Sequence, residues 1–411
     1  MNSYKDLVKQ HPRYLLYALL HTSASGFGQT FFFSLFVTPI CAYYQLERGF
    51  YGGMYGLASV VSAGLLFFTG PVIDRVNVRN FSLFTTLVAA SGCFIMGTRP
   101  SVELFFVGVV LLRHGGQGLM PHISSTSIAR FFAGVRGRAL SIANLGFSLG
   151  EGTLPALMGY LLTKLDWSQI FLGCGVFLVV VFIPISQLLL SRNDVFLTPI
   201  PRDKSNDTTT DKSNSAWRLV LRSKYFFMVL PICMSAPGLL TGFIFYQSAI
   251  AEENNWSFLW VSSCFAGFAL ARVFSSFSAG PLIDRFSAKS LLPFYVIPMI
   301  TGFVCLLTIP NQFAVLLFWM AGGISVGLGS TIKQAIWAEV FPVYCLGAIK
   351  SIMGPVVVFA TAITPPLFGW ALDSGYVIDD LLLVSILFTV ASIGLALLAA
   401  RYTVDTQSVR S

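Results

Sequence analysis

A ten-residue sequence occurs twice in this chain and constrains its fold more than any other feature. Residues 70–79 read GPVIDRVNVR, and residues 280–289 read GPLIDRFSAK, 210 positions later. Each copy lies between two apolar segments. The spacing is far longer than a solenoid repeat, and duplicated halves are a common construction of membrane proteins. The sequence therefore predicts two related halves.

The composition identifies an integral membrane protein. Hydrophobic residues make up 55% of the 411 residues and charged residues only 11%, whereas soluble domains carry about 25% charged residues. The apolar segments reach the roughly 20 residues that a spanning helix needs, and they lack the alternation of a β-barrel. We predict an all-α fold of twelve transmembrane helices in two pseudo-symmetric bundles of six. The helices are expected near 14–42, 50–72, 80–97, 103–131, 138–163, 168–190, 223–250, 256–282, 288–309, 312–340, 346–371 and 378–401.

Basic residues predict the orientation of the chain. The predicted halves are residues 1–190 and 223–411, joined by a polar linker at 191–222. Lys and Arg concentrate at the two termini, in this linker and in the loops on the same side, which places that side in the cytoplasm. The net charge of +8 thus reflects membrane topology, and we expect no nucleic-acid partner.

The repeated sequence resembles the signature loop between the second and third helices of each half in the major facilitator superfamily. That family usually has Gly two residues after the first Arg, where this chain has Asn77 and Ser287. The resemblance implies two six-helix bundles and a conformational latch in each. The alternative is a charged turn that only sets the orientation of the chain. Gly70 and Gly280 are expected to let helices approach closely, and the acids to pair with bases or cap a helix. The predicted latch residues are Gly70, Asp74, Arg75, Arg79, Gly280, Asp284, Arg285 and Lys289.

Charged residues inside the predicted spans are the first candidates for function, because an ionisable group at bilayer depth is costly. Arg113 lies in the fourth span and Glu151 in the fifth. Their distances from the turn near Gly134 place them within roughly 6 Å in depth, so that they could pair. The pair is either linked to substrate and protons or a structural contact that neutralises its own cost.

Arg272 lies well inside the eighth span, with no acid near it in the sequence. A guanidinium grips carboxylates bidentately, so Arg272 is a candidate anion ligand. It is similar to the eighth-helix arginine of the monocarboxylate and oxalate/formate porters, although Phe268 stands where those proteins often have Asp. The alternative is a packing arginine paired with Glu339 or a backbone carbonyl.

Weaker candidates complete the predicted site. Lys333 in the tenth span is a second candidate anion ligand, and His122 in the fourth is a candidate proton carrier beside Glu151. Gln29 in the first span and Tyr246 and Gln247 in the seventh are polar residues on helices that line the cavity in the family that the chain resembles. Helix packing is the alternative interpretation for these residues.

These features together predict a secondary active transporter. We expect a small organic anion, first of all a carboxylate, moved by alternating access and coupled to protons or to a counter-substrate. The alternatives are an exporter of amphipathic molecules and a membrane sensor without transport. No ATP-binding or hydrolase motif and no metal-ligand cluster is present in the sequence, so we expect neither an enzyme nor a cofactor. A bacterial inner membrane and a monomer are expected.

Overall fold

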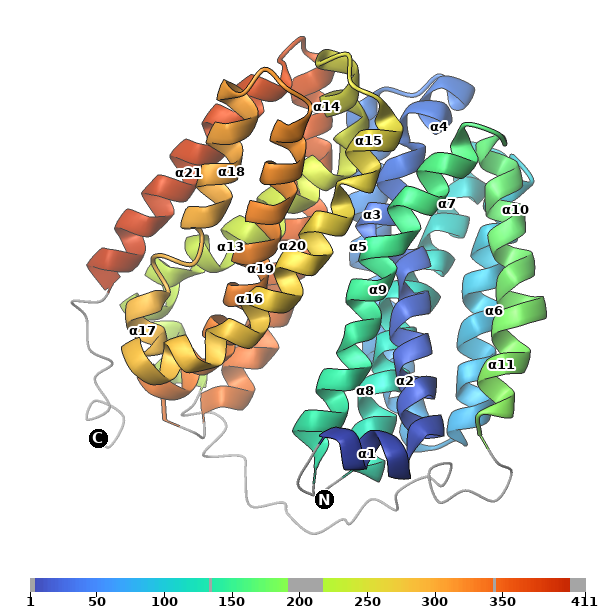
Figure 1. The fold of residues 1–411 in the computed structure, drawn as a ribbon, viewed down its shortest axis with the longest axis horizontal. Helices are drawn as coiled ribbons and strands as arrows, with labels where there is room; N and C mark the ends of the chain where they lie inside the picture. The colour runs from blue at the N-terminus through green and yellow to red at the C-terminus, as the bar shows by residue number, and fades with distance from the viewer. Residues whose placement is uncertain (1–3, 133–134, 191–216, 343–344, 400–411) are drawn as a thin grey trace.

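The fold is helical throughout the described part of the chain. The computed structural model describes residues 4–132, 135–190, 217–342 and 345–399, and it places no strand among them. The predicted linker lies outside these residues except for 217–222, which are helical. Figure 1 shows the helices of residues 4–190 as one group beside a second group formed by residues 217–399.

The first group begins with α1 (Tyr4–Gln10), after which six rods follow one another. Several rods consist of consecutive helical pieces. The rods are α2 (Pro12–Ala24) with η1 (Ser25–Gly28), α3 (Thr30–Phe33), η2 (Ser34–Phe36) and α4 (Val37–Tyr44); α5 (Arg48–Thr69) with η3 (Gly70–Asp74); α6 (Val78–Gly97); α7 (Val102–Leu112) with the π-helical η4 (Arg113–Leu119) and α8 (Met120–Phe131); α9 (Arg136–Leu162); and α10 (Trp167–Phe177) with the π-helical η5 (Leu178–Phe182) and α11 (Ile183–Leu188).

The second group repeats this order. Its rods are α13 (Lys224–Phe245) with α14 (Gln247–Glu253); α15 (Phe258–Ser263) with α16 (Phe265–Phe286); α17 (Ala288–Leu291) with α18 (Ile297–Thr308); α19 (Phe313–Val340); α20 (Leu346–Asp373); and α21 (Ile378–Ala399).

Length and hydropathy alone identify fewer spans than the twelve rods. Eight described helices are long and apolar enough to cross a membrane, or nine if the bent first rod is one span. The fourth rod is not among them, and its η4 carries Arg113, His114 and Gln117. The ninth is missing because α18 is short. The fifth rod, α9, is long but carries Glu151 and several polar residues. Two of the rods that fall short, the fourth and the fifth, thus carry the buried charged residues Arg113 and Glu151.

The duplication extends to irregularities of the backbone. The first rod bends by 45°, and its backbone leaves helical geometry again at Phe36, with φ −105° and ψ 3°. The seventh rod breaks at Tyr246, which lies 210 positions later, with φ −106° and ψ 33°. Corresponding breaks in the two halves support a common origin of their backbones.

The two halves are joined at the end of the molecule opposite the N-terminus, here called the far end. Figure 1 shows the two groups close together there and farther apart at the other end, here called the linker end. At the far end Arg48 forms an ion pair with Glu252 at 2.6 Å. The Asp373 carboxylate accepts hydrogen bonds from the backbone N–H groups of Arg48, at 3.1 Å, and Gly49, at 2.6 Å. An acid of the second half thus caps the N-terminus of α5.

Close backbone contact joins the first and fourth rods within the first half. A Cβ added at Gly28 would lie 2.7 Å from the Leu112 carbonyl oxygen and 2.9 Å from the Gly116 carbonyl carbon. Both obstacles are backbone atoms, so a side chain at Gly28 forces the helices apart.

We predict that Gly28→Ala lowers the melting temperature, with a cost of about 1–3 kcal/mol, because over-packing displaces backbone. The measurement is thermal unfolding of the purified protein, followed by tryptophan fluorescence. Gly64→Ala is the matched control, because a Cβ at Gly64 meets nothing within 4 Å. Equal melting temperatures for the two variants would contradict the proposed contact.

Candidate functional site

A polar cavity of about 400 Å³ lies between the two halves. One wall is α9 of the first half, and the others are α16 and α19 of the second. Leu145, Phe147, Val273 and Phe277 supply its apolar surface. Its polar side chains are Ser141, Asn144 and Ser148 of α9, Arg272 and Ser276 of α16, and Ser330, Thr331 and Gln334 of α19. A guanidinium therefore lies among small hydroxyl and amide groups at membrane depth.

Arg272 is joined to Glu151 across the two halves. Its Nη1 donates to Oε1 of Glu151 in an ion pair. The Arg272 side chain is 28% exposed and that of Glu151 10%. The second carboxylate oxygen, Oε2, is buried and has no hydrogen-bond partner among the described residues. Arg272 thus contacts both a buried acid and the cavity.

This pair corrects two predictions. The predicted ion pair between Arg113 and Glu151 is wrong, because Glu151 faces α16 while Arg113 faces the first and second rods. The predicted partner Glu339 of Arg272 is also wrong. Its carboxylate instead accepts from the backbone N–H groups of Ala288, at 2.7 Å, and Lys289, at 2.9 Å. Arg272 is therefore paired, where the sequence suggested a cation without a nearby acid.

Helical periodicity explains how α9 and α16 build the cavity. Ser141, Asn144, Ser148 and Glu151 follow at intervals of three and four residues, which places them on one face of α9. At about 1.5 Å per residue, Glu151 lies about 22 Å from the start of α9 and Arg272 about 21 Å from the end of α16, so their depths match. The site expected from the sequence did not include Asn144, Ser148, Thr331 and Gln334. The polar stripe on an otherwise apolar helix was the signal that could have revealed the first two.

Arg113 lies inside the first half and does not line this cavity. Only 3% of it is exposed, and its Nη1 donates to the Gly28 carbonyl at 3.2 Å and to the Tyr55 hydroxyl. Its guanidinium carbon lies 4.5 Å from the centre of the Tyr55 ring, and the Tyr55 hydroxyl donates to Thr30 at 2.8 Å. Arg113 thus ties the first, second and fourth rods together, and a role in substrate binding stays a prediction.

Lys333 faces the interior of the second half. Its Nζ lies 5.7 Å from the centre of the Tyr295 ring, a cation–π distance. Lys333 makes no ion pair within the described residues, and it is not among the side chains that line the cavity. Its role as an anion ligand therefore stays a prediction.

The remaining candidates lie at the breaks of the first and seventh rods. Gln29 precedes α3, where the first rod leaves helical geometry. The Tyr246 hydroxyl donates to the carbonyls of Arg48, at 2.8 Å, and Pro365, at 2.9 Å. Gln247 donates to the Ser34 hydroxyl at 2.6 Å. Tyr246 and Gln247 therefore connect the two halves, and neither lines the polar cavity.

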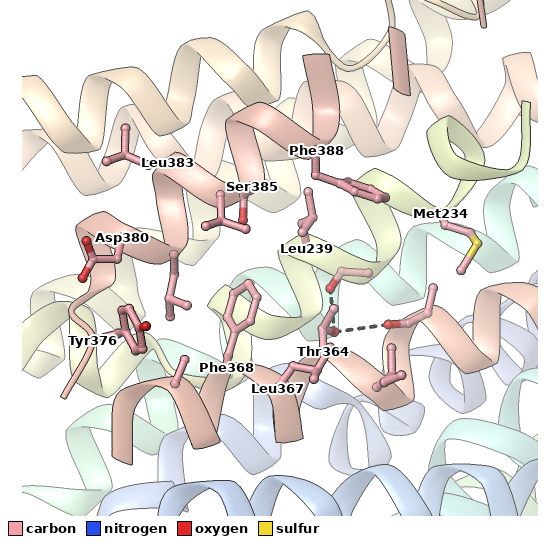
Figure 2. A pocket seen from close by; sticks show the side chains of 16 residues that line it. Met234, Leu239, Thr364, Leu367, Phe368, Tyr376, Asp380, Leu383, Ser385 and Phe388 are labelled. Atoms are coloured by element: carbon pink, nitrogen blue, oxygen red, sulfur yellow. Dashed lines mark hydrogen bonds between the residues drawn. The ribbon is translucent and has the colours of Figure 1, made fainter. Parts of the chain in front are cut away.

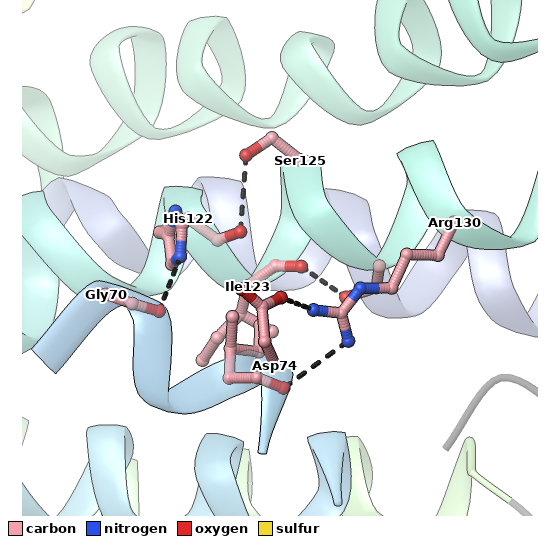
Figure 3. A network of polar contacts seen from close by, with 8 residues as sticks. Gly70, Asp74, His122, Ile123, Ser125 and Arg130 are labelled. Carbon is pink, nitrogen blue, oxygen red and sulfur yellow. Dashed lines mark hydrogen bonds and ion pairs between the residues drawn. The ribbon is translucent and has the colours of Figure 1, made fainter. Parts of the chain in front are cut away.

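The first predicted latch forms a network at the linker end of α5 (Figure 3). Arg130 of α8 pairs with Asp74, and it also donates to the Ile73 carbonyl at 3.4 Å. His122 Nε2 donates to the Gly70 carbonyl at 3.0 Å. His122, predicted as a proton carrier, thus contacts the loop and not the cavity. Arg79 donates to Gln187 at 2.8 Å, which joins the third and sixth rods.

The second predicted latch is built differently. Glu339 caps the N-terminus of α17 through the two bonds described above. Asp284 makes no ion pair within the described residues, and Arg285 stacks on Phe286 at 5.1 Å. Lys289 lies 5.8 Å from the centre of the Tyr225 ring. The expected close helix approach at Gly280 is wrong, because a Cβ there would meet nothing within 4 Å.

Comparison with known proteins identifies the family. The model of the Major Facilitator Superfamily matches residues 18–249 and 239–411, nearly the whole chain in two copies. The chain belongs to the major facilitator superfamily. It is a multi-pass membrane protein and a transporter of small molecules, not an enzyme, and its fold supports secondary transport by alternating access. No curated protein matches its sequence at a significant level.

Solved structures of two transporters share this fold. A bacterial homolog of the human lysosomal transporter Spinster, in an inward-facing and unoccupied conformation, matches with a TM-score of 0.74 and 14% identity over 98% of each chain. The nucleoside transporter NupG matches with a TM-score of 0.74 and 12% identity over 96% of this chain and 99% of its own. At this identity the likeness concerns the fold. No group of three or more potential metal ligands occurs in the part of the chain that the structure describes.

We predict that Glu151→Gln and Arg272→Gln each lower the melting temperature, while the double variant recovers part of the loss. Removing one partner of a buried pair leaves an uncompensated charge and costs about 3–5 kcal/mol. Because Arg272 keeps 28% exposure, we expect about 1–3 kcal/mol. Thermal unfolding of the four proteins measures the coupling. The control is Arg113→Gln added to Glu151→Gln, which should recover nothing.

Proposed function

We propose that this transporter carries a small organic anion, first of all a carboxylate, and that Arg272 binds it. The observation that supports the proposal is the position of Arg272 in the wall of a polar cavity between the halves. The guanidinium offers five N–H donors, and the contact with Glu151 uses Nη1. Donors remain for a substrate carboxylate, and charge-assisted bonds of this kind are among the strong ones.

Glu151 is the proposed coupling group. A substrate carboxylate at Arg272 competes with Glu151 for the same cation, and a displaced Glu151 favours uptake of a proton because an isolated buried carboxylate is costly. The unpartnered Oε2 of Glu151 supports this role. Proton coupling and exchange against a second anion both fit the proposal. His122 remains a weaker candidate because its ring already bonds the Gly70 carbonyl.

We propose that the loops at residues 70–79 and 280–289 stabilise one state of the cycle. In this structure the halves are closed at the far end by Arg48, Glu252 and Asp373. If the termini are cytoplasmic, this is an inward-facing state. A bacterial inner membrane and a monomer complete the proposal, with the basic residues on the linker side as the support for the orientation.

An exporter of amphipathic molecules is the second candidate, supported by an apolar cavity of about 770 Å³ between α13, α20 and α21. Figure 2 shows Met234, Leu239 and Phe388 around it, with Asp380 at one edge. The neighbouring Val384 is 65% exposed, so the cavity borders the surface that faces lipid. An apolar body with a cationic group fits such a surface.

We predict that small carboxylates raise the melting temperature of the wild-type protein by mass action, and that Arg272→Lys weakens their binding by about 10- to 100-fold. Lysine keeps the charge but cannot form the bidentate contact, and hydrogen bonds to charged groups contribute about 1.5–3 kcal/mol. Thermal shifts with a panel of mono- and dicarboxylates measure the effect. Arg222→Lys is the matched control, since Arg222 is exposed and lies outside the cavity.

The same panel distinguishes the two candidate functions. Carboxylate binding that Arg272→Lys leaves intact would remove Arg272 from the site. Stabilisation by lipophilic cations alone, such as tetraphenylphosphonium, would overturn the anion proposal and favour the exporter.

A further inference from the structure

Four polar side chains of the cavity have no hydrogen-bond partner within the described protein. They are Asn144 and Ser148 of α9 and Thr331 and Gln334 of α19. They come from both halves and face the same cavity as Arg272. Hydrogen-bonding groups at membrane depth must be satisfied by protein, water or a ligand, because leaving them unpaired is costly.

Other hydroxyl groups on α9, α16 and α19 behave differently. Ser141 donates to the Gly137 carbonyl at 3.0 Å, Ser275 to Ala271 at 2.7 Å and Ser330 to Gly327 at 2.7 Å. This bond to the preceding turn is the usual way in which a helical Ser or Thr is satisfied. Ser148 and Thr331 do not make it, and the amides of Asn144 and Gln334 offer both donors and acceptors. Their free donors and acceptors are therefore available to a ligand in the cavity.

The arrangement has a direction along the helices. At about 1.5 Å per residue, Asn144 and Ser148 lie about 12 Å and 18 Å from the linker end of α9. Gln334 and Thr331 lie about 9 Å and 14 Å from that end of α19, whereas Arg272 is about 21 Å deep on α16. A ligand with its carboxylate at Arg272 and its chain directed toward the linker end thus passes four side chains.

The groups on the wall match hydroxyl groups on a ligand. Amides and hydroxyls both donate and accept hydrogen bonds, as alcohols do. An aliphatic carboxylate offers none of these four side chains a hydrogen-bond partner, whereas the hydroxyls of a ligand can bond all of them in place of water. The cavity of about 400 Å³ corresponds to roughly a dozen waters at about 30 Å³ each, so it is larger than a two- or three-carbon acid requires.

We propose that the transported anion is a polyhydroxylated carboxylate with the size of a five- or six-carbon sugar acid. This inference rests on the proposed function, because it assumes that Arg272 holds the carboxylate. Arg272 binds the acid group, and Asn144, Ser148, Thr331 and Gln334 bind hydroxyls along the chain of the ligand. The apolar side chains of Phe147 and Phe277 contact its C–H faces.

The test compares three six-carbon probes on the purified full-length protein by calorimetry. Gluconate carries a carboxylate and hydroxyls, hexanoate only the carboxylate, and sorbitol only the hydroxyls. We expect gluconate to bind at least tenfold more tightly than either of the others. Asn144→Ala and Gln334→Ala should each reduce the ratio of gluconate to hexanoate affinity by about tenfold and leave hexanoate binding unchanged.

Ser91→Ala is the control variant. Ser91 is an exposed hydroxyl on α6 that bonds the Leu87 carbonyl at 2.8 Å, so its removal should keep the ratio. Gel filtration and thermal unfolding establish that each variant is folded, and Asn144→Ser provides a second, milder change at the same position with a smaller expected loss.

The outcomes separate this inference from the proposed function. Equal binding of hexanoate and gluconate, lost in Arg272→Lys, would overturn the sugar-acid proposal and keep the carboxylate transporter. Sorbitol binding as tight as that of gluconate and independent of Arg272 would overturn both. Absence of binding by all three probes would overturn the sugar-acid proposal, while the carboxylate panel would still decide the proposed function.

Discussion

The ion pair between Arg272 and Glu151 is the contact on which the interior of this protein depends. It joins α16 of the second half to α9 of the first, about 21–22 Å from the linker end of each helix. Either charge alone at this depth would be costly, because it would lose its hydration without compensation; the ion pair supplies that compensation. The pair therefore lies at the inner end of the polar cavity. Separation of the halves at this point requires another charged group to replace one of the two partners.

Alternating access requires that the contacts between the halves break and form in turn. At the far end these contacts are polar and lie near the surface: Arg48 with Glu252, and Asp373 on the N-terminus of α5. In the interior the corresponding contact is Arg272 with Glu151. In the proposed cycle a substrate anion takes the place of Glu151 on Arg272, so binding itself supplies the compensation that the separating charges need. Protonation of Glu151 removes the charge that would otherwise be left unpaired on α9 of the first half.

The duplicated halves differ in chemistry at their two predicted latches. Arg130 pairs with Asp74 in the first half. Glu339, the residue 209 positions later, has the opposite charge and caps the backbone at Ala288 and Lys289. Arg130 thus joins the fourth rod to its loop through the Asp74 side chain. Glu339 joins the tenth rod to its loop through the N-terminus of α17. The same backbone position thus carries a base in one half and an acid in the other, and both contact the loop that we propose as a latch.

The sequence by itself determined the membrane environment, the duplication and the family, because these follow from hydropathy and from a pattern that repeats along one dimension. It also placed Arg113, Glu151 and Arg272 at bilayer depth, since the helical rise converts residue number into height. Only the tertiary structure decided that Glu151 meets Arg272 and that Arg113 meets Tyr55. Height along a helix is local, whereas the neighbour that a side chain faces depends on how distant helices pack around each other. For the same reason Asn144 and Gln334 became candidate ligands only when α9 and α19 were seen to enclose one cavity.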